Sequence, residues 1–343
     1  MSVLDIFNND AFKTTSMLAT NDFIEYQPTR MSSMGIFTET PVRTESVAIE
    51  ARSGVLKLIQ TSQRGSPLGQ RDNEKRNVRD FRTTRIAEGD RIKASELAFI
   101  RGYGETEQVA MVQEEVARRL NGPTGIMANI QLTMEHMRLG AVQGIVLDAD
   151  GSSIINWFDA FGVSAATEID FDLDNATPVD GALREQCTQV TRAMKRAAQG
   201  AWNIGTRIHG LCGDAFYDNF IKHPEIRKLF LNRDQSMYVE GGGAYEQFTY
   251  GGITFENYQG TDDGSTVAIG TDKIKFFPVN TPGVFREVYS PGEQFEHIGK
   301  MGQSIYPMVV RDLKRDSYVD IEGYTYPLHV CTRPAMLQSG RRT

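Results

Sequence analysis

Apolar and polar residues recur with different periods along the chain, and each period predicts a different element. Residues 105–120 carry apolar side chains at i, i+3, i+7 and i+11, with paired Glu and Arg residues on the opposite face, which predicts an amphipathic helix. A second apolar stripe with helical spacing covers residues 126–141. Between the stripes stand Gly122, suited to the position after a helix end, and Pro123, suited to a first turn. We therefore expect a long helical spine that is broken in the middle, with Gly122 and Pro123 as candidate hinge residues.

Before this spine the period of the pattern is two. From Ser46 apolar and polar side chains alternate, with Val47 and Ile49 on one side, and further apolar residues follow at 55–59. Apolar residues then recur among arginines at 78–86. Residues 60–77 between them are polar, charged and rich in turn-forming types. This pattern predicts an exposed two-stranded ribbon, which needs a surface to lie on because two strands alone are only marginally stable. Residues 1–44 show no sustained period and are expected to form an extended arm.

After the spine, residues 144–147 and 152–158 flank an Asp-Ala-Asp-Gly turn signal, and they predict a β-hairpin. Residues 175–178, Asn-Ala-Thr-Pro, form a helix-start signal. An apolar stripe from Val179 to Ala198 then predicts a helix that ends near Gly200.

The rest of the chain predicts shorter elements. Residues 207–212 favour a strand, and Asp214 is placed to cap a helix that stops before Pro224. Beyond Pro224 we expect mostly short strands broken by Gly and Pro. No internal repeat and no linker between independent domains is visible. The predicted helices and strands together give the expected class, α+β, with projecting pieces.

Charge is distributed unevenly. The net charge is −7, with an acidic excess over residues 1–50, a basic stretch over 52–93 and an acidic stretch over 143–186. Such blocks suggest surfaces that meet other surfaces, and the acidic balance limits sequence-independent binding of phosphate. No apolar run approaches the ~20 residues of a membrane span, and no secretion signal is visible, so we expect no membrane association and folding in a cytoplasm.

Candidate catalytic and metal chemistry is sparse. The three cysteines are widely separated, and the five histidines lack metal-ligand spacing, so we expect no metal and no cofactor. The most enzyme-like group is His209, Cys212 and Asp214, where a strand runs into a helix, and it leaves open a cytosolic hydrolase using His209 and Asp214. The Gly-rich stretches 101–104 and 241–243 lack the phosphate-loop pattern and are expected to be hinges or turns.

The basic stretch carries the candidate contact residues. Its cations alternate with acidic residues and hold a single interleaved aromatic side chain, so a stacking platform for nucleic acid is not evident, although a DNA-binding protein remains an alternative. Pairing with acidic patches on adjacent copies of the chain is favoured. These inter-subunit contact candidates are Arg64, Arg71, Lys75, Arg76, Arg79, Arg82 and Arg85.

Four segments of the C-terminal third carry a resemblance to a known family, and they occupy residues 250–258, 278–285, 287–291 and 326–334. They include an Asn-Thr-Pro-Gly signature at 280–283 and a Pro-Leu signature at 327–328 followed by Arg-Pro at 333–334. In type and order they resemble the lambda-type major capsid protein E family of tailed bacteriophages, whose members have the Hong Kong 97 capsid fold.

The resemblance implies a division of the chain and a non-enzymatic role. Residues 1–44 would be the N-terminal arm, 45–95 the extended β-ribbon loop, 96–177 the peripheral domain with spine helix and hairpin, 178–310 the axial domain, and 311–343 the return to the peripheral domain and the tail. The implied function is a major capsid protein that self-assembles into an icosahedral or prolate head shell around double-stranded DNA, without sequence-specific binding.

The same resemblance implies the partners. Pentamers and hexamers of the chain would form the closed shell, together with a portal, a separate scaffolding protein and a decoration protein. The protein would be assembled in the host bacterial cytoplasm and reside in the virion. An encapsulin-like nanocompartment shell, which holds a cargo enzyme, is the alternative within the same fold.

Overall fold

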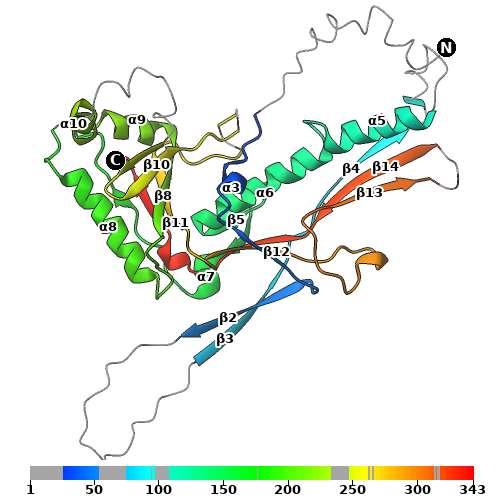
Figure 1. The fold of residues 1–343 in the computed structure, drawn as a ribbon, viewed down its shortest axis with the longest axis horizontal. Helices are drawn as coiled ribbons and strands as arrows, with labels where there is room; N and C mark the ends of the chain where they lie inside the picture. Colours follow the sequence, from blue (N-terminus) through cyan, green and yellow to red (C-terminus); the bar gives the residue numbers. More distant parts are fainter. Residues whose placement is uncertain are drawn as a thin grey trace, which may run out of the picture.

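A computed structural model gives the structure of residues 26–53, 75–93, 95–96, 108–175, 177–232, 247–261, 263–264, 266–312, 314 and 317–343. Figure 1 shows an elongated molecule in which a long helical segment lies over a narrow sheet at one end and a wider sheet packed with helices lies at the other. A two-stranded ribbon projects from the middle. The predicted turns at 101–104 and 241–243 lie outside the described residues, as do residues 1–25 of the predicted arm.

The helical spine consists of α5 (Gln108–Asn121) and α6 (Ile126–Gln143), which follow one line in Figure 1. The predicted break between them is confirmed. The Gly122 amide donates to the Arg118 carbonyl at 2.8 Å, and the Gly125 amide donates to the Gly122 carbonyl at 2.9 Å. A Cβ on Gly122 would lie 2.2 Å from the Arg118 oxygen, so the chain needs glycine to leave α5 at this angle.

One face of a narrow three-stranded sheet lies against the spine. The strands follow the order β13 (Tyr306–Arg311), β14 (Tyr318–Thr325), β4 (Ile86–Lys93), all antiparallel. Ile92 and Ile321 point toward the spine and pack on Ile126, Ile130 and Met134, which are all buried. Because strand side chains alternate between faces, the neighbours of Ile321 face away from the helices, and Asp320 and Tyr324 are part of that open face.

The wide sheet has six strands and two apolar faces. On one face of β8, Ile208 and Cys212 join a core that also contains Phe216 and Phe220 of α9. On the other face, Leu211 joins a second core, the central core, which contains Trp157 and Phe277. Sheet order is β7 (Ile169–Asp170), β16 (Gln338–Arg341), β11 (Lys273–Val279), β8 (Arg207–Cys212), β10 (Ile253–Asn257) and β9 (Gln247–Tyr250), with helices α8 (Ala182–Ala197), α9 (Asp214–Lys222) and α10 (Pro224–Asn232).

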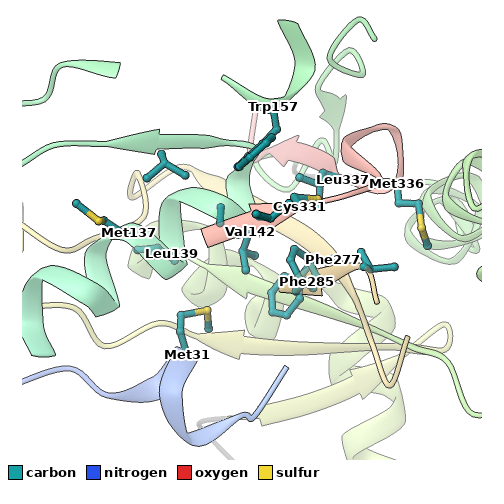
Figure 2. Close-up of a cluster of buried hydrophobic side chains, with 14 of the residues drawn as sticks. Met31, Met137, Leu139, Val142, Trp157, Phe277, Phe285, Cys331, Met336 and Leu337 are labelled. Atoms are coloured by element: carbon teal, nitrogen blue, oxygen red, sulfur yellow. The ribbon is translucent and has the colours of Figure 1, made fainter. Parts of the chain in front are cut away.

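A third sheet joins the two ends of the molecule. It has the order β1 (Thr38–Pro41), β12 (Phe285–Tyr289), β15 (Pro327–Cys331), with β1 parallel to β12. Its side chains pack with those of α6, α7 (Trp157–Phe161) and β11 in the central core, and Figure 2 shows Met137, Trp157 and Phe277 among the side chains of this cluster. The short helix α3 (Arg30–Ser33) closes this core through Met31, which is fully buried.

The predicted antiparallel ribbon is present, formed by β2 (Ser46–Ser53) and β3 (Lys75–Arg82). Its second strand begins within the segment 60–77 that was expected to be the polar tip, and residues 54–74 lie outside the described residues. A β-hairpin is also present where the sequence predicts one, formed by β5 (Ile145–Leu147) and β6 (Ser153–Asn156). Its second strand is shorter than expected. Trp157 and Phe158 belong to α7 because the Asn156 side chain accepts hydrogen bonds from the Phe158 and Asp159 amides and caps a helix there.

Three further expectations about helices were wrong. The helix expected to include Val179 begins only at Ala182, because the chain reaches it through Gly181 at φ +89°, and Val179 is exposed. Gly213, not Asp214, occupies the N-cap of α9. Pro224 does not open a region of short strands but begins α10, since proline fits the first helical turn.

The described residues contain neither a membrane-spanning helix nor a cluster of metal-ligating side chains. None of the helices among them is long and apolar enough to cross a membrane. No group of three or more potential metal-ligating His, Cys, Asp or Glu side chains occurs among them either.

Candidate functional site

The base of the ribbon is anchored on the body by aromatic side chains. Phe81 of β3 meets Trp157 edge-on with ring centroids 5.1 Å apart, and the centroid of Phe161 lies 6.4 Å from that of Phe81. Val47 and Ile49 of β2 pack against the same core. Trp157 is fully buried and donates its indole N–H to the His329 carbonyl at 3.1 Å, so the platform itself is fixed. The ribbon therefore leaves the body in a defined direction.

The structure places only part of the predicted basic contact set. Arg64 and Arg71 lie outside the described residues, and for Lys75 and Arg76 only the backbone of β3 is described. Strand alternation puts Arg79 on the face of Phe81, next to α7, and Arg82 on the opposite, exposed face. These positions are compatible with contacts to a neighbouring copy, which stay a prediction.

Arg85, the last member of that set, already has partners within the chain. Its guanidinium contacts Glu293 at 2.9 Å and lies 5.2 Å from the ring centroid of Tyr324. Both charged side chains of this pair are about half exposed, so the pair contributes little to stability by itself. The ion pair between Arg85 and Glu293 connects the start of β4 to the loop that follows β12.

A short segment near the N-terminus is held by two carboxylates. Glu135 of α6 is buried and accepts hydrogen bonds from the backbone amides of Met31 at 2.5 Å and Ser32 at 3.1 Å. Arg30 makes a bidentate pair with Glu256 of β10, at 2.5 and 2.7 Å. The segment thereby connects the spine to the wide sheet.

A buried charge network lies next to this segment. Arg138 of α6 donates to Glu287 of β12 at 2.8 Å, and His329 of β15 lies 2.9 Å from the same carboxylate. Burial opposes ionisation of Glu287, but the His329 hydrogen bond and the nearby charges lower its pKa to about 2. Burial lowers the pKa of His329, so its neutral ring donates Nε2–H to the carboxylate.

The enzyme-like group does not form a catalytic arrangement. His209 shares a 2.8 Å hydrogen bond with Glu256, while Cys212 lies on the other face of β8 and burial raises its pKa well above that of a free thiol. Asp214 accepts a hydrogen bond from Asn257 at 3.0 Å. Thus His209, Cys212 and Asp214 are not brought together, and each has a structural partner or environment of its own.

Comparison with known proteins gives this geometry its context. The family model described as phage major capsid protein E matches residues 13–342. The chain belongs to this family. The major capsid protein of Salmonella phage Felix O1 is 24% identical over 339 residues, covering 90% of each chain. That of Pseudomonas phage KPP10 is 24% identical over 330 residues, again covering 90% of each.

The fold agrees with solved capsid structures. The subunit in the cyanophage A-1(L) capsid aligns over 94% of each chain with a TM-score of 0.53 at 12% identity. This capsid protein therefore has the Hong Kong 97-like fold, mixed α/β with a long helix. It is a major capsid protein that forms the phage head shell and resides in the virion, and it is not an enzyme. The hydrolase alternative is wrong, and neither the family nor these relatives indicate a nanocompartment.

Sequence reasoning missed the charged residues that fix the capsid subunit's interior. Glu135 and Arg138 interrupt the apolar stripe of α6 beside Met134 and Met137, and a charged pair at i, i+3 within a buried stripe is the one local signal they leave. Their partner Glu287 is 149 residues from Arg138 along the chain, and no local pattern predicts that contact.

We expect acid to destabilise the capsid subunit. A folded-state pKa below the unfolded value stabilises the fold above that value, so the contribution of His329 is lost as the pH falls below 6.5. That of Glu287 is lost as the pH falls from 4.5 toward about 2. Glu135 has the opposite sign, because burial raises its pKa and protonation favours its buried state. Urea unfolding at several pH values measures the sum.

The matched variant is His329→Gln, which keeps an amide donor for Glu287 but cannot be protonated. Its free energy of unfolding should decrease less than that of the wild type between pH 7 and pH 5. An identical decrease in both proteins would show that other groups carry the acid sensitivity.

Proposed function

We propose that this capsid protein builds a closed icosahedral or prolate shell of pentamers and hexamers around double-stranded DNA, and that the β2–β3 ribbon makes the principal contact between neighbours. The observation that supports the ribbon's role is its geometry. Its base is clamped on Trp157 and Phe161, whereas Val78, farther along β3, is exposed. A two-stranded ribbon is only marginally stable by itself, which favours a second copy as the surface on which it lies.

The rest of the proposed organisation follows the family resemblance. Residues 1–44 act as the arm, 45–95 as the extended loop, 96–177 with 311–343 as the peripheral domain, and 178–310 as the axial domain around the capsomer centre. Each contact is modest, but every added subunit satisfies several interfaces, and closure makes the sum strong. Gly122 and Pro123 are proposed hinges, because the spine changes helix there.

The proposed partners are a portal, a separate scaffolding protein and a decoration protein, with assembly in the bacterial cytoplasm. DNA is enclosed without sequence-specific binding, since the chain carries a net charge of −7 and avoids a large positive field. Basic residues of the ribbon, including Arg79 and Arg82, pair with acidic patches on the adjacent copy.

Deleting residues 64–75 should leave a folded subunit that does not close into shells, because the base of the ribbon is built from Val47, Ile49 and Phe81 and lies outside the deletion. Electron microscopy and sedimentation of the expressed protein measure closed particles. A length-matched control replaces residues 64–75 by Gly and Ser, which separates the need for side chains from the need for reach. Closed particles of normal stability from the deleted chain would remove the ribbon from the assembly mechanism.

A further inference from the structure

An apolar knob stands out on the loop between β12 and β13. Phe295, in the single-turn helix η3 (Phe295–His297), has 94% of its surface exposed, Ile298 has 69% and Met301 has 48%. Three large apolar side chains within seven residues are unusual on a water-facing loop, because exposed apolar surface is costly unless another surface covers it. In Figure 1 this loop is the orange projection beneath β13 and β14.

The knob is held by a rigid base. The Gly302 amide donates to the Val42 carbonyl at 2.8 Å, and the Gln303 amide donates to the Tyr306 hydroxyl at 2.7 Å. The His297 ring lies 4.6 Å from that of Tyr306. A Cβ on Gly302 would lie 2.0 Å from the Tyr289 carbonyl, so the backbone passes this point in close contact. The apolar side chains are therefore presented by an ordered scaffold.

The knob and the ribbon leave the body at the same place. Ser290, at the start of the loop, accepts a hydrogen bond from the Thr83 hydroxyl at 3.0 Å and donates to the Thr44 carbonyl at 2.8 Å. Arg85 contacts Glu293 at 2.9 Å. Thr44 precedes β2, and Thr83 and Arg85 follow β3, so three contacts join the loop to the base of the ribbon. Both project on the side of the narrow sheet away from the spine in Figure 1.

We propose that Phe295, Ile298 and Met301 form an apolar contact that seats on a second copy of this chain in the assembled shell. The inference rests on the proposed shell function and adds a contact that does not use the ribbon's strands. A second copy is the occupant indicated, because the knob is continuous with the base of the ribbon, the proposed contact element, and this capsid protein assembles into the shell as a homo-oligomer.

The size of the knob suits that role. An aromatic side chain such as Phe295 buries roughly 150–250 Å², and Ile298 and Met301 add further apolar surface beside it. One partner of a standard protein interface contributes about 800 Å². The knob alone is too small for a stable dimer, but it can supply the apolar centre of a larger contact that forms when several interfaces close together.

The test compares two variants of the full chain that both remove exposed apolar side chains. Phe295→Ser/Ile298→Ser should keep the wild-type circular dichroism and melting temperature, whereas the yield of closed particles falls at least tenfold. Ile204→Ser is the control, since Ile204 is fully exposed but stands alone in a turn between Asn203 and Gly205. This control should assemble like the wild type.

Two further measurements keep the proposal falsifiable. Phe295→Leu should retain assembly, because an apolar side chain remains. A photo-crosslinking amino acid at position 295 of otherwise wild-type shells should join two chains, and mass spectrometry identifies the receiving surface. Normal particle yield from the double serine variant, or crosslinks confined to the same chain or to DNA, would overturn the knob contact. Failure of the wild-type chain itself to form shells would instead contradict the proposed function.

Discussion

Replacing Arg138 by Met will lower the free energy of unfolding of the subunit by about 3–5 kcal/mol, the range expected when one partner of a buried ion pair is removed. The side chain of Arg138 is only 12% exposed, and its partner Glu287 is deeply buried on β12. Methionine fills similar space but leaves the carboxylate without its cation. The buried carboxylate of Glu135, which lies 3.9 Å from the Arg138 guanidinium, also loses this positive charge.

The control for this prediction is Arg118→Met on α5. Arg118 pairs with Glu115 at 2.6 Å, but it is largely exposed, so its loss should cost at most about 1 kcal/mol. Urea unfolding of both variants at neutral pH gives the comparison. The difference between wild type and Arg138→Met should also shrink below pH 4, where carboxylates become protonated. Equal losses in the two variants would mean that the buried network contributes no more than a surface pair.

Replacing Phe81 by Ala will detach the ribbon from its platform while the subunit stays folded. Phe81 is half-buried against Trp157 and Phe161, so the stability loss should be about 1–3 kcal/mol, below the 3–5 kcal/mol of a fully buried phenylalanine. The effect on assembly should be far larger. A ribbon without a fixed direction loses conformational entropy each time it docks on a neighbour, which weakens every contact. We therefore expect the yield of closed particles to fall more than tenfold.

Phe81→Leu separates packing from aromatic geometry, and it should keep most of the stability and of the particle yield. Val78→Ala on the same strand is the stability control, because Val78 is exposed and its loss should leave the melting temperature unchanged. Differential scanning fluorimetry and negative-stain counting give the two readouts. Wild-type particle yield from Phe81→Ala would show that the aromatic base does not aim the ribbon.

Local patterns in the sequence were sufficient to predict a helix or strand where contacts between residues close in the chain decide where that element ends. The helical stripes and Gly122 predict the broken spine, because hydrogen bonds between near neighbours decide where α5 ends. The ribbon follows from the alternation of apolar and polar residues in the same way. Helix starts were less certain. Pro224 is compatible with stopping one helix and with starting another, and the sequence pattern does not choose between them.

The misassigned residues after β6 show a second limit. Trp157 and Phe158 continue an apolar run that fits a buried strand or a helix, since a short apolar run has no period of its own. The Asn156 cap and the central core decide for the helix, and this choice creates the platform under Phe81.

The sequence by itself determined the mixed class of the fold, the broken spine, the paired ribbon and the absence of a catalytic pattern, because each depends on neighbours within a few turns or strands. Only the tertiary structure decided which charged residues pair inside the subunit and which apolar residues remain exposed on its surface. Glu287 meets Arg138 across 149 residues, and the exposed Phe295 is apolar in sequence like any core residue. Burial and pairing are properties of the folded chain, because they depend on which distant segments exclude water from each other.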